Sequence, residues 1–367
     1  MIKFNLYTLY PYIKPVKNKY GLLFSIIFGR TPNKIKLKNG SVIDTSSLQF
    51  ETILCLLGTI CFSTSYSVKS NIIELCFDTK NKFIINLNTL NLEDKNLLEL
   101  LFFAQRHGAN FLINEDIDTD DFRDKTFKIS EMNGKKIIET STGIKFYLDS
   151  MQPRNTIMET FVQKIHLISS EDDWNNKIVV DVGAECGDTP LYFASLGATV
   201  YAFEPVKAHY DAMMRNLSLN PELAKKIIPI NAAIGKDELL KFNQSSLADI
   251  AGVASFVYNV YGKDTGYGAT KTFEIQGYSL ESAFEKFDIQ HVDLLKMDCK
   301  GCEFFLTKEA LKNVDKVKIE YFAADNSHKL KDLYNLLENA GFKNMIYRAN
   351  PFANYSNSYE GRMYGKK

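Results

Sequence analysis

Short apolar runs alternate with segments of helical periodicity in the C-terminal half of the chain. Five runs rich in Val, Ile and Leu, each bounded by glycine or polar residues, predict buried strands. They lie at residues 177–183, 199–204, 227–234, 293–298 and 317–322. Apolar residues at helical spacing predict helices. These lie at residues 188–195, 207–219 and 328–340. The alternation predicts an α/β fold, a mostly parallel sheet with helices on both faces. A final strand pair is expected at residues 342–348 and 359–364.

Residues 1–150 have a different pattern, with short strands expected at 33–37, 83–87 and 143–148 around a helix at 95–106. We therefore expect an N-terminal α+β domain over 1–150, which carries no motif that indicates its role, and a second domain over 151–367. No Pro/Ser-rich linker separates them, so we expect the two to pack closely.

The first candidate binding feature is a glycine-rich turn between the strand at 177–183 and the helix that follows it. Glycine permits a sharp turn and close approach of the backbone to a ligand, and a helix N-terminus offers free N–H groups to an anion such as a carboxylate. The candidate cofactor-binding residues of this turn are Asp181, Gly183, Glu185, Gly187, Asp188 and Thr189.

A second feature is Glu204, which ends the next strand, 23 residues after Asp181. A carboxylate at this point of a dinucleotide fold accepts the ribose hydroxyls. Gly183 and Gly187 are four residues apart, however, and the G-x-G-x-x-G of nicotinamide binders is absent. The pattern therefore favours S-adenosyl-L-methionine over NAD, with Pro205 and Asn231 as further candidate cofactor contacts.

Four segments together resemble the FkbM-type methyltransferase family. They are residues 181–194 (DVGAECGDTPLYFA), 201–205 (YAFEP), 215–220 (RNLSLN) and 294–304 (LLKMDCKGCEF). The resemblance covers about residues 154–342 and implies a class I methyltransferase (Rossmann-like) fold, O-methylation of a hydroxyl on a sugar, glycan or natural product, and a site lined by Asp298 and Glu303. Lys300 stands where the family commonly has an acidic residue, which leaves the charge of the acceptor pocket open.

Candidate catalytic residues lie at the carboxyl ends of the last two parallel strands. Lys296 and Asp298 are two apart on one strand and therefore project to the same face, at the edge where open α/β sheets bind ligands. The alternative for Lys296 is a buried ion pair. Deprotonation of an acceptor hydroxyl needs a base. By position, Asp298 is the first candidate and Glu320 the second.

The stretch 244–270 has no sustained periodicity and is rich in Ser, Gly and Tyr. Long inserted loops are often functional, and aromatic side chains such as Tyr258 and Tyr267 suit sugar rings or apolar acceptors. We expect this loop to cover the acceptor side of the cofactor, with a solvated surface loop as the alternative.

The 44 basic and 44 acidic residues balance, so no overall field attracts nucleic acid, and no apolar stretch is long enough to span a membrane. A small-molecule or glycan acceptor is expected, and the oligomeric state stays open. The six cysteines are too sparse for a secreted disulfide scaffold, which indicates the cytoplasm. The Cys299-x-x-Cys302 spacing, with Cys186 expected on a nearby loop, leaves metal or disulfide chemistry as an alternative. We expect all three to be inert packing thiols, with no metal site.

Two other functions remain open from the residues alone. One is a non-catalytic protein that binds the nucleoside and recruits a partner, and the other is an NAD-dependent oxidoreductase, which the glycine spacing disfavours. Formation of S-adenosylhomocysteine with a hydroxylated acceptor would separate the first from an enzyme.

Overall fold

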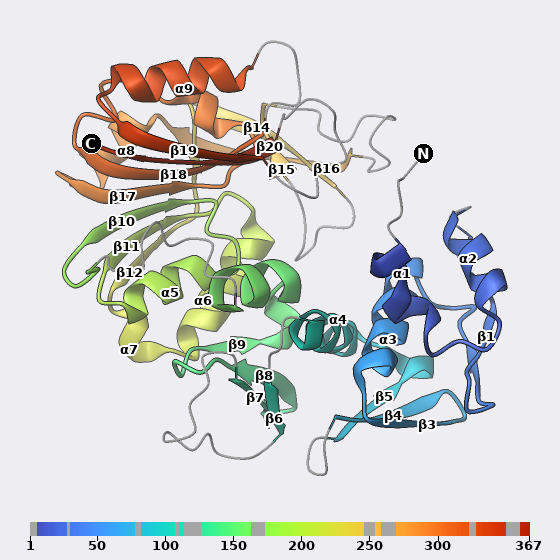
Figure 1. Ribbon diagram of the computed structural model, residues 1–367. Helices are drawn as coiled ribbons and strands as arrows, with labels where there is room; N and C mark the ends of the chain where they lie inside the picture. Colours follow the sequence, from blue (N-terminus) through green and yellow to red (C-terminus); the bar gives the residue numbers. More distant parts are fainter. Residues whose placement is uncertain are drawn as a thin grey trace. The chain divides into compact units, whose positions relative to one another are not determined.

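The computed structural model describes residues 6–27, 30–77, 82–106, 110–113, 126–162, 173–245, 254–257, 269–322, 328–349 and 360–367. Its backbone divides into two compact units, Met1–Gln163 and Lys164–Lys367. Each unit is described by itself below, with the element labels of Figure 1.

The N-terminal unit combines helices with three small sheets. Its helices are α1 (Leu6–Ile13), α2 (Lys19–Ile27), α3 (Phe50–Phe62) and α4 (Leu92–Arg106). Two single turns, η1 (Leu87–Thr89) and η3 (Leu148–Ser150), and a π-helix, η4 (Pro153–Val162), complete the helical elements of this unit. Its strands are β1 (Lys34–Lys36), β2 (Val42–Asp44), β3 (Ser65–Lys69), β4 (Ile72–Cys76), β5 (Lys82–Asn86), β6 (Asn110–Ile113), β7 (Thr126–Met132), β8 (Lys135–Glu139) and β9 (Lys145–Tyr147).

Helices α3 and α4 pack against each other through a close contact of Gly58 with Phe102. A Cβ at Gly58 would lie 2.2 Å from the Phe102 ring, so only glycine allows this approach. Phe102 is 1% exposed and belongs to the core of this unit.

A seven-stranded sheet forms the centre of the C-terminal unit (Figure 1). Its strands, in spatial order, are β12 (Ile227–Ile230), β11 (Thr199–Phe203), β10 (Ile178–Val182), β17 (Val292–Met297), β18 (Val314–Phe322), β20 (Glu360–Lys366) and β19 (Lys343–Ala349). The first five are parallel, and β20 is antiparallel to both β18 and β19. The predicted mostly parallel sheet and the closing strand pair are confirmed.

The helices of this unit are α5 (Asp188–Ser195), α6 (Lys207–Ser218), α7 (Pro221–Ala224), α8 (Leu280–Lys286) and α9 (Leu330–Asn339), with a single turn η5 at Cys302–Phe305. Leu333 and Leu337 of α9 and Leu280 of α8 pack with alternate residues of β10, β17 and β18 to form the main core. Because that face takes one set of alternate residues, the other set, which includes Asp181, Lys296 and Lys318, projects to the opposite face.

A second sheet occupies the region around the predicted loop, in the order β13 (Ala233–Ile234), β16 (Ala269–Tyr278), β14 (Leu239–Ser245) and β15 (Ala254–Ser255). The single strand predicted at 227–234 is thus two strands, and both ends of the predicted loop are strands. Phe242 and Phe273 stack at 5.3 Å across the antiparallel pair β14 and β16, which is a favourable cross-strand contact.

Candidate functional site

The carboxyl ends of β10, β11 and β17 meet at one edge of the sheet. The Gly183 N–H donates to the Phe203 carbonyl at 2.9 Å, and the Asp298 N–H donates to the Val182 carbonyl at 2.9 Å. Gly183 has φ of 84°, and a Cβ there would lie 2.2 Å from the Asp298 carbonyl oxygen. Glycine is therefore required at this position for two strand ends to approach each other.

The rest of the turn leads directly into α5. Gly187, with φ of 86°, precedes the helix, and a Cβ there would lie 2.8 Å from the Met213 side chain of α6. Asp188 and Thr189 form the buried first turn of α5. The predicted arrangement of strand, glycine turn and helix is present, and its glycines are required by packing contacts within the protein itself.

Glu204 organises the neighbouring turns through its carboxylate. Its two oxygens accept the N–H groups of Glu185 and Val206, each at 2.8 Å, and the side chain is almost fully buried. The Asn231 amide donates to the backbone carbonyls of Glu204 and Pro205 at 2.8 and 3.3 Å. Each carboxylate oxygen has a second lone pair that can accept from a ligand. Glu204 therefore combines a structural role with capacity for a hydroxyl group.

Further acids surround this edge. Burial raises the pKa of Glu185 to about 7, helped by the nearby negative charges of Asp188, Glu204 and Asp298 and opposed by His209. The His209 Nδ1 lies 3.5 Å from a Glu204 oxygen. Carboxylates that repel one another in a buried region are stabilised by a bound cation.

A row of charged side chains crosses the sheet below the edge. Asp181 of β10, Lys296 of β17 and Lys318 of β18 occupy register-matched positions. The Lys296 ammonium lies 2.8 Å from an Asp181 carboxylate oxygen and donates to the Gly183 carbonyl at 3.2 Å. Burial acts to lower the pKa of Lys296, but the carboxylates, chiefly that of Asp181, raise it above its ordinary value. Lys296 is thus the cation of a buried ion pair, which makes it a poor base.

Asp181 has unused hydrogen-bonding capacity. Its side chain is fully buried, and its second carboxylate oxygen has no hydrogen-bond partner among the residues that the structure describes. Burial raises the pKa of Asp181 to about 6, against the lowering effect of Lys296.

Lys318 is a site residue that the sequence analysis missed. It is fully buried, and its ammonium has no hydrogen-bond partner within the described part of the chain. Burial lowers the pKa of Lys318 to about 8, with Glu320 acting in the opposite direction and Lys296 reinforcing the effect. The sequence contains one indication of this residue, because charged side chains alternate along the strand at Lys316, Lys318 and Glu320. That alternation shows that the three side chains project to one face, but it does not show what they contact.

The two candidate bases, Asp298 and Glu320, are connected by Lys300. The Lys300 ammonium lies 2.8 Å from an Asp298 oxygen and 3.1 Å from a Glu320 oxygen. The other Glu320 oxygen accepts from Arg362 Nε at 3.1 Å. Burial opposes ionisation of Glu320, but these cations, together with Lys318, hold its pKa well below the usual range. Glu320 is therefore a weaker base than a free carboxylate.

Glu303 lies in η5, immediately after Gly301. Its carboxylate is fully buried and accepts the N–H groups of Gly301 at 2.8 Å and Phe322 at 2.6 Å. It thus connects the turn after β17 to the end of β18. Burial raises the pKa of Glu303 to about 7, although these N–H groups act to lower it.

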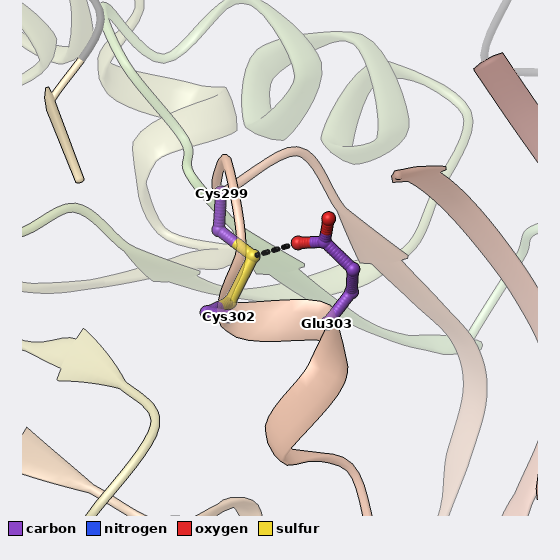
Figure 2. A group of neighbouring side chains, drawn as sticks. All are labelled: Cys299, Cys302 and Glu303. Atoms are coloured by element: carbon purple, nitrogen blue, oxygen red, sulfur yellow. Dashed lines mark hydrogen bonds between the residues drawn. A yellow bond between two sulfur atoms is a disulfide. The ribbon is translucent and has the colours of Figure 1, made fainter. Parts of the chain in front are cut away.

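The expectation of inert packing thiols at Cys299 and Cys302 is wrong, because the two sulfurs form a disulfide (Figure 2). Two cysteines three apart in a tight turn place their Cα atoms 5.5 Å apart, within the range that a disulfide spans. Cys186 is buried and is not part of a disulfide. Tyr258, Tyr267 and most of the predicted loop lie outside the described residues.

Residues 181–343 match the family model of the methyltransferase FkbM domain. This part of the chain is therefore similar to the methyltransferase FkbM domain. The match begins at Asp181 and ends at Lys343, so it includes all the site residues described above except Arg362. The FkbM resemblance expected from the sequence is confirmed over these residues, and the sheet of the C-terminal unit confirms the expected α/β fold.

No curated protein matches this chain. Among solved structures, the METTL16 methyltransferase domain is similar over 77% of this chain and 85% of that chain, with 14% identity and a TM-score of 0.39. The fibrillarin pre-rRNA processing protein of Methanococcus jannaschii is similar over 82% of this chain and 96% of that chain, with 14% identity and a TM-score of 0.35. The precorrin-6y C5,15-methyltransferase of Geobacter metallireducens is similar over 53% of this chain and 81% of that chain, with 10% identity and a TM-score of 0.29. At these scores the similarities carry no argument about this protein.

None of the helices in the described parts of the chain is long and apolar enough to cross a membrane.

Proposed function

We propose that the FkbM domain is an S-adenosyl-L-methionine-dependent methyltransferase that O-methylates a hydroxyl of a sugar, glycan or small natural product. The observation that carries this proposal is the cluster of acids at the meeting point of β10, β11 and β17. Burial and the negative charges of Asp188 and Asp298 raise the pKa of Glu185 there. The buried Asp181 has an oxygen without a partner in the described structure. A cationic cofactor fits such a site.

The residues present fit this cofactor in three respects. Its positive groups would be held by Asp181 and Asp188, and its ribose hydroxyls by the remaining lone pairs of Glu204. Its carboxylate would lie at the N-terminus of α5, where N–H groups are free of intrahelical partners. When bound, S-adenosyl-L-methionine supplies a methyl group that is already electrophilic, so the protein contributes mainly orientation, exclusion of water and control of one proton.

Asp298 is the proposed base for the acceptor hydroxyl. Its side chain is 30% exposed at the sheet edge, whereas that of Glu320 is 12% exposed and held between two cations. Asp298 would accept the hydroxyl proton on a carboxylate oxygen, and Lys300 would hold the carboxylate in place. Lys296, whose ammonium pairs with Asp181, would be a poor base for this step.

Isothermal titration calorimetry with S-adenosylhomocysteine tests the cofactor site. We expect binding by the wild-type protein and a loss of about 1.5 to 3 kcal/mol in Glu204→Gln, since a charged acceptor is replaced by a neutral amide. The exposed Glu222→Gln is the matched control and should bind as the wild type does. Because Glu204 also holds two backbone N–H groups, circular dichroism must first show that the variant is folded. Unchanged affinity in a folded Glu204→Gln protein would exclude Glu204 from the site.

A further inference from the structure

The turn between β17 and η5 contains a disulfide whose two cysteines differ in exposure. Cys302 is 2% exposed, whereas Cys299 is partly exposed. Lys300 and Gly301, between them, have φ of 51° and 121°. A disulfide that closes so short a loop restricts the unfolded chain very little, so stabilisation alone gives a weak reason for it.

Glu303 lies beside this disulfide (Figure 2). Its Oε2 is 3.5 Å from the Cys299 Sγ, and both sulfurs and a carboxylate oxygen lie within 4.8 Å of one another. The carboxylate is fully buried, and its pKa of about 7 allows it to gain and lose a proton near neutrality. Three backbone N–H groups, those of Phe322, Glu303 and Gly301, and the nearby Lys300 charge act to lower this pKa, against the effect of burial.

We propose that Cys299, Cys302 and Glu303 form a thiol–disulfide exchange centre, in which Glu303 carries the proton of the Cys299 thiol. This inference goes beyond methyl transfer and does not depend on it. The co-reactant is a thiol, either a small molecule such as glutathione or a protein dithiol.

In reduction, a thiolate of the co-reactant attacks the more exposed Cys299 sulfur. The bond between the cysteines breaks, Cys302 leaves as a thiolate and takes a proton, and a mixed disulfide forms at Cys299. A second thiolate then attacks the co-reactant sulfur of that mixed disulfide and releases Cys299, which takes a proton from Glu303. Two electrons and two protons enter the protein, and the two thiols leave as one disulfide.

Oxidation reverses these steps. Glu303 accepts the proton of the Cys299 thiol, and the resulting thiolate, which is the reactive form, attacks a disulfide of the co-reactant. That disulfide bond breaks, one co-reactant sulfur leaves as a thiolate and takes a proton from the solvent, and a mixed disulfide forms at Cys299. The Cys302 thiol then loses its proton to the solvent, and its thiolate attacks the Cys299 sulfur, which closes the bond and releases the second co-reactant thiol.

The position of the centre connects it with the FkbM site. Lys300, which lies between the cysteines, pairs with Asp298 and Glu320, and its carbonyl accepts from the Ser255 hydroxyl at 2.8 Å. Reduction would free the turn that holds this ammonium and thereby alter the charge around the proposed base.

The first experiment follows the thiol state of the folded full-length protein in glutathione buffers of graded composition. After rapid alkylation, mass spectrometry measures the disulfide-bonded fraction of the peptide with Cys299 and Cys302. We expect full, reversible conversion without loss of the circular dichroism signal, and the same curve for the control Cys186→Ser. The proposal would be overturned if Cys299 and Cys302 were reduced only when the protein unfolds. It would also be overturned if they stayed reduced at every ratio of oxidised to reduced glutathione.

The second experiment tests Glu303 through the rate at which glutathione disulfide oxidises the reduced Cys299 and Cys302 pair, as a function of pH, because Glu303 accepts the Cys299 proton in that step. The wild-type rate should show an inflection near pH 7, and Glu303→Gln should lose it. Lys300→Met, which removes the other charge acting on Glu303, should shift the inflection but keep it. A wild-type rate without an inflection would exclude proton transfer by Glu303, even if Glu303→Gln failed to fold.

Discussion

Lys318→Met offers a quantitative test of the charged row beneath the site. The ammonium is fully buried and unpartnered within the described structure, and its pKa falls from 10.5 to about 8. At 1.36 kcal/mol for each pKa unit, the charged form costs the folded state about 3 kcal/mol. Methionine has a similar length and no charge, so below pH 8 we expect Lys318→Met to be the more stable protein by up to this amount.

The sign of the pH dependence follows from the lowered pKa. Between about pH 8 and pH 10.5 the unfolded chain holds the Lys318 proton and the folded protein does not, so wild-type stability rises with pH in this range. The free-energy cost of burying the charged Lys318 ammonium is complete below pH 8 and disappears as the pH approaches 10.5. The stability difference between Lys318→Met and the wild type should therefore shrink over this window.

Denaturation by guanidinium at pH 7, 8, 9 and 10 measures this difference. Trp174 is the single tryptophan and is buried in the C-terminal unit, so its fluorescence reports the unfolding of that unit. The exposed Lys308→Met is the matched control and should show no such change. A difference that is constant from pH 7 to 10, or a Lys318→Met protein that is less stable at every pH, would mean that the ammonium is satisfied by a partner.

Three further predictions concern the turn, the cysteines and the loop. Gly183→Ala should destabilise the protein by several kcal/mol in thermal denaturation, since the new Cβ meets the Asp298 carbonyl; Gly143→Ala, where φ is also positive but nothing lies within 4 Å, should cost less. Elemental analysis of protein purified without added metal should find no stoichiometric zinc or iron, and a tightly held metal would contradict the exchange centre. Shortening of the segment 258–268, which leaves β15 in place, should keep S-adenosylhomocysteine affinity nearly intact and abolish methyl transfer, whereas equal turnover would make that segment a simple connector.

Apolar periodicity was sufficient to predict the main sheet, because buried parallel strands have near-continuous apolar sequences. It placed α5 at its observed bounds and the other predicted helices within a few residues. It missed α8, which is only seven residues long and begins at a Ser279 cap. It also missed the β14 and β16 pair, in which Phe242 and Phe273 stack across strands that are distant in sequence.

The features of the candidate site that depend on one local stretch of sequence could be predicted, and the contacts between neighbouring strands could not. The glycine turn and Glu204 could be predicted because each depends on a local sequence. The partners of Lys296, Lys300 and Glu320 could not, since they depend on the register between β10, β17, β18 and β20, which no single strand reveals. The disulfide was missed because sparse cysteines in an α/β enzyme indicate free thiols.

The most direct test of the central claim is a crystal structure of the protein with S-adenosylhomocysteine. The account predicts that the ribose hydroxyls lie against the Glu204 carboxylate, that the amino-acid part lies between Asp181 and the N-terminus of α5, and that the sulfur lies on the side of Asp298. A nucleoside bound away from the ends of β10 and β11, or no binding at saturating concentration, would contradict the assignment of this edge as the cofactor site.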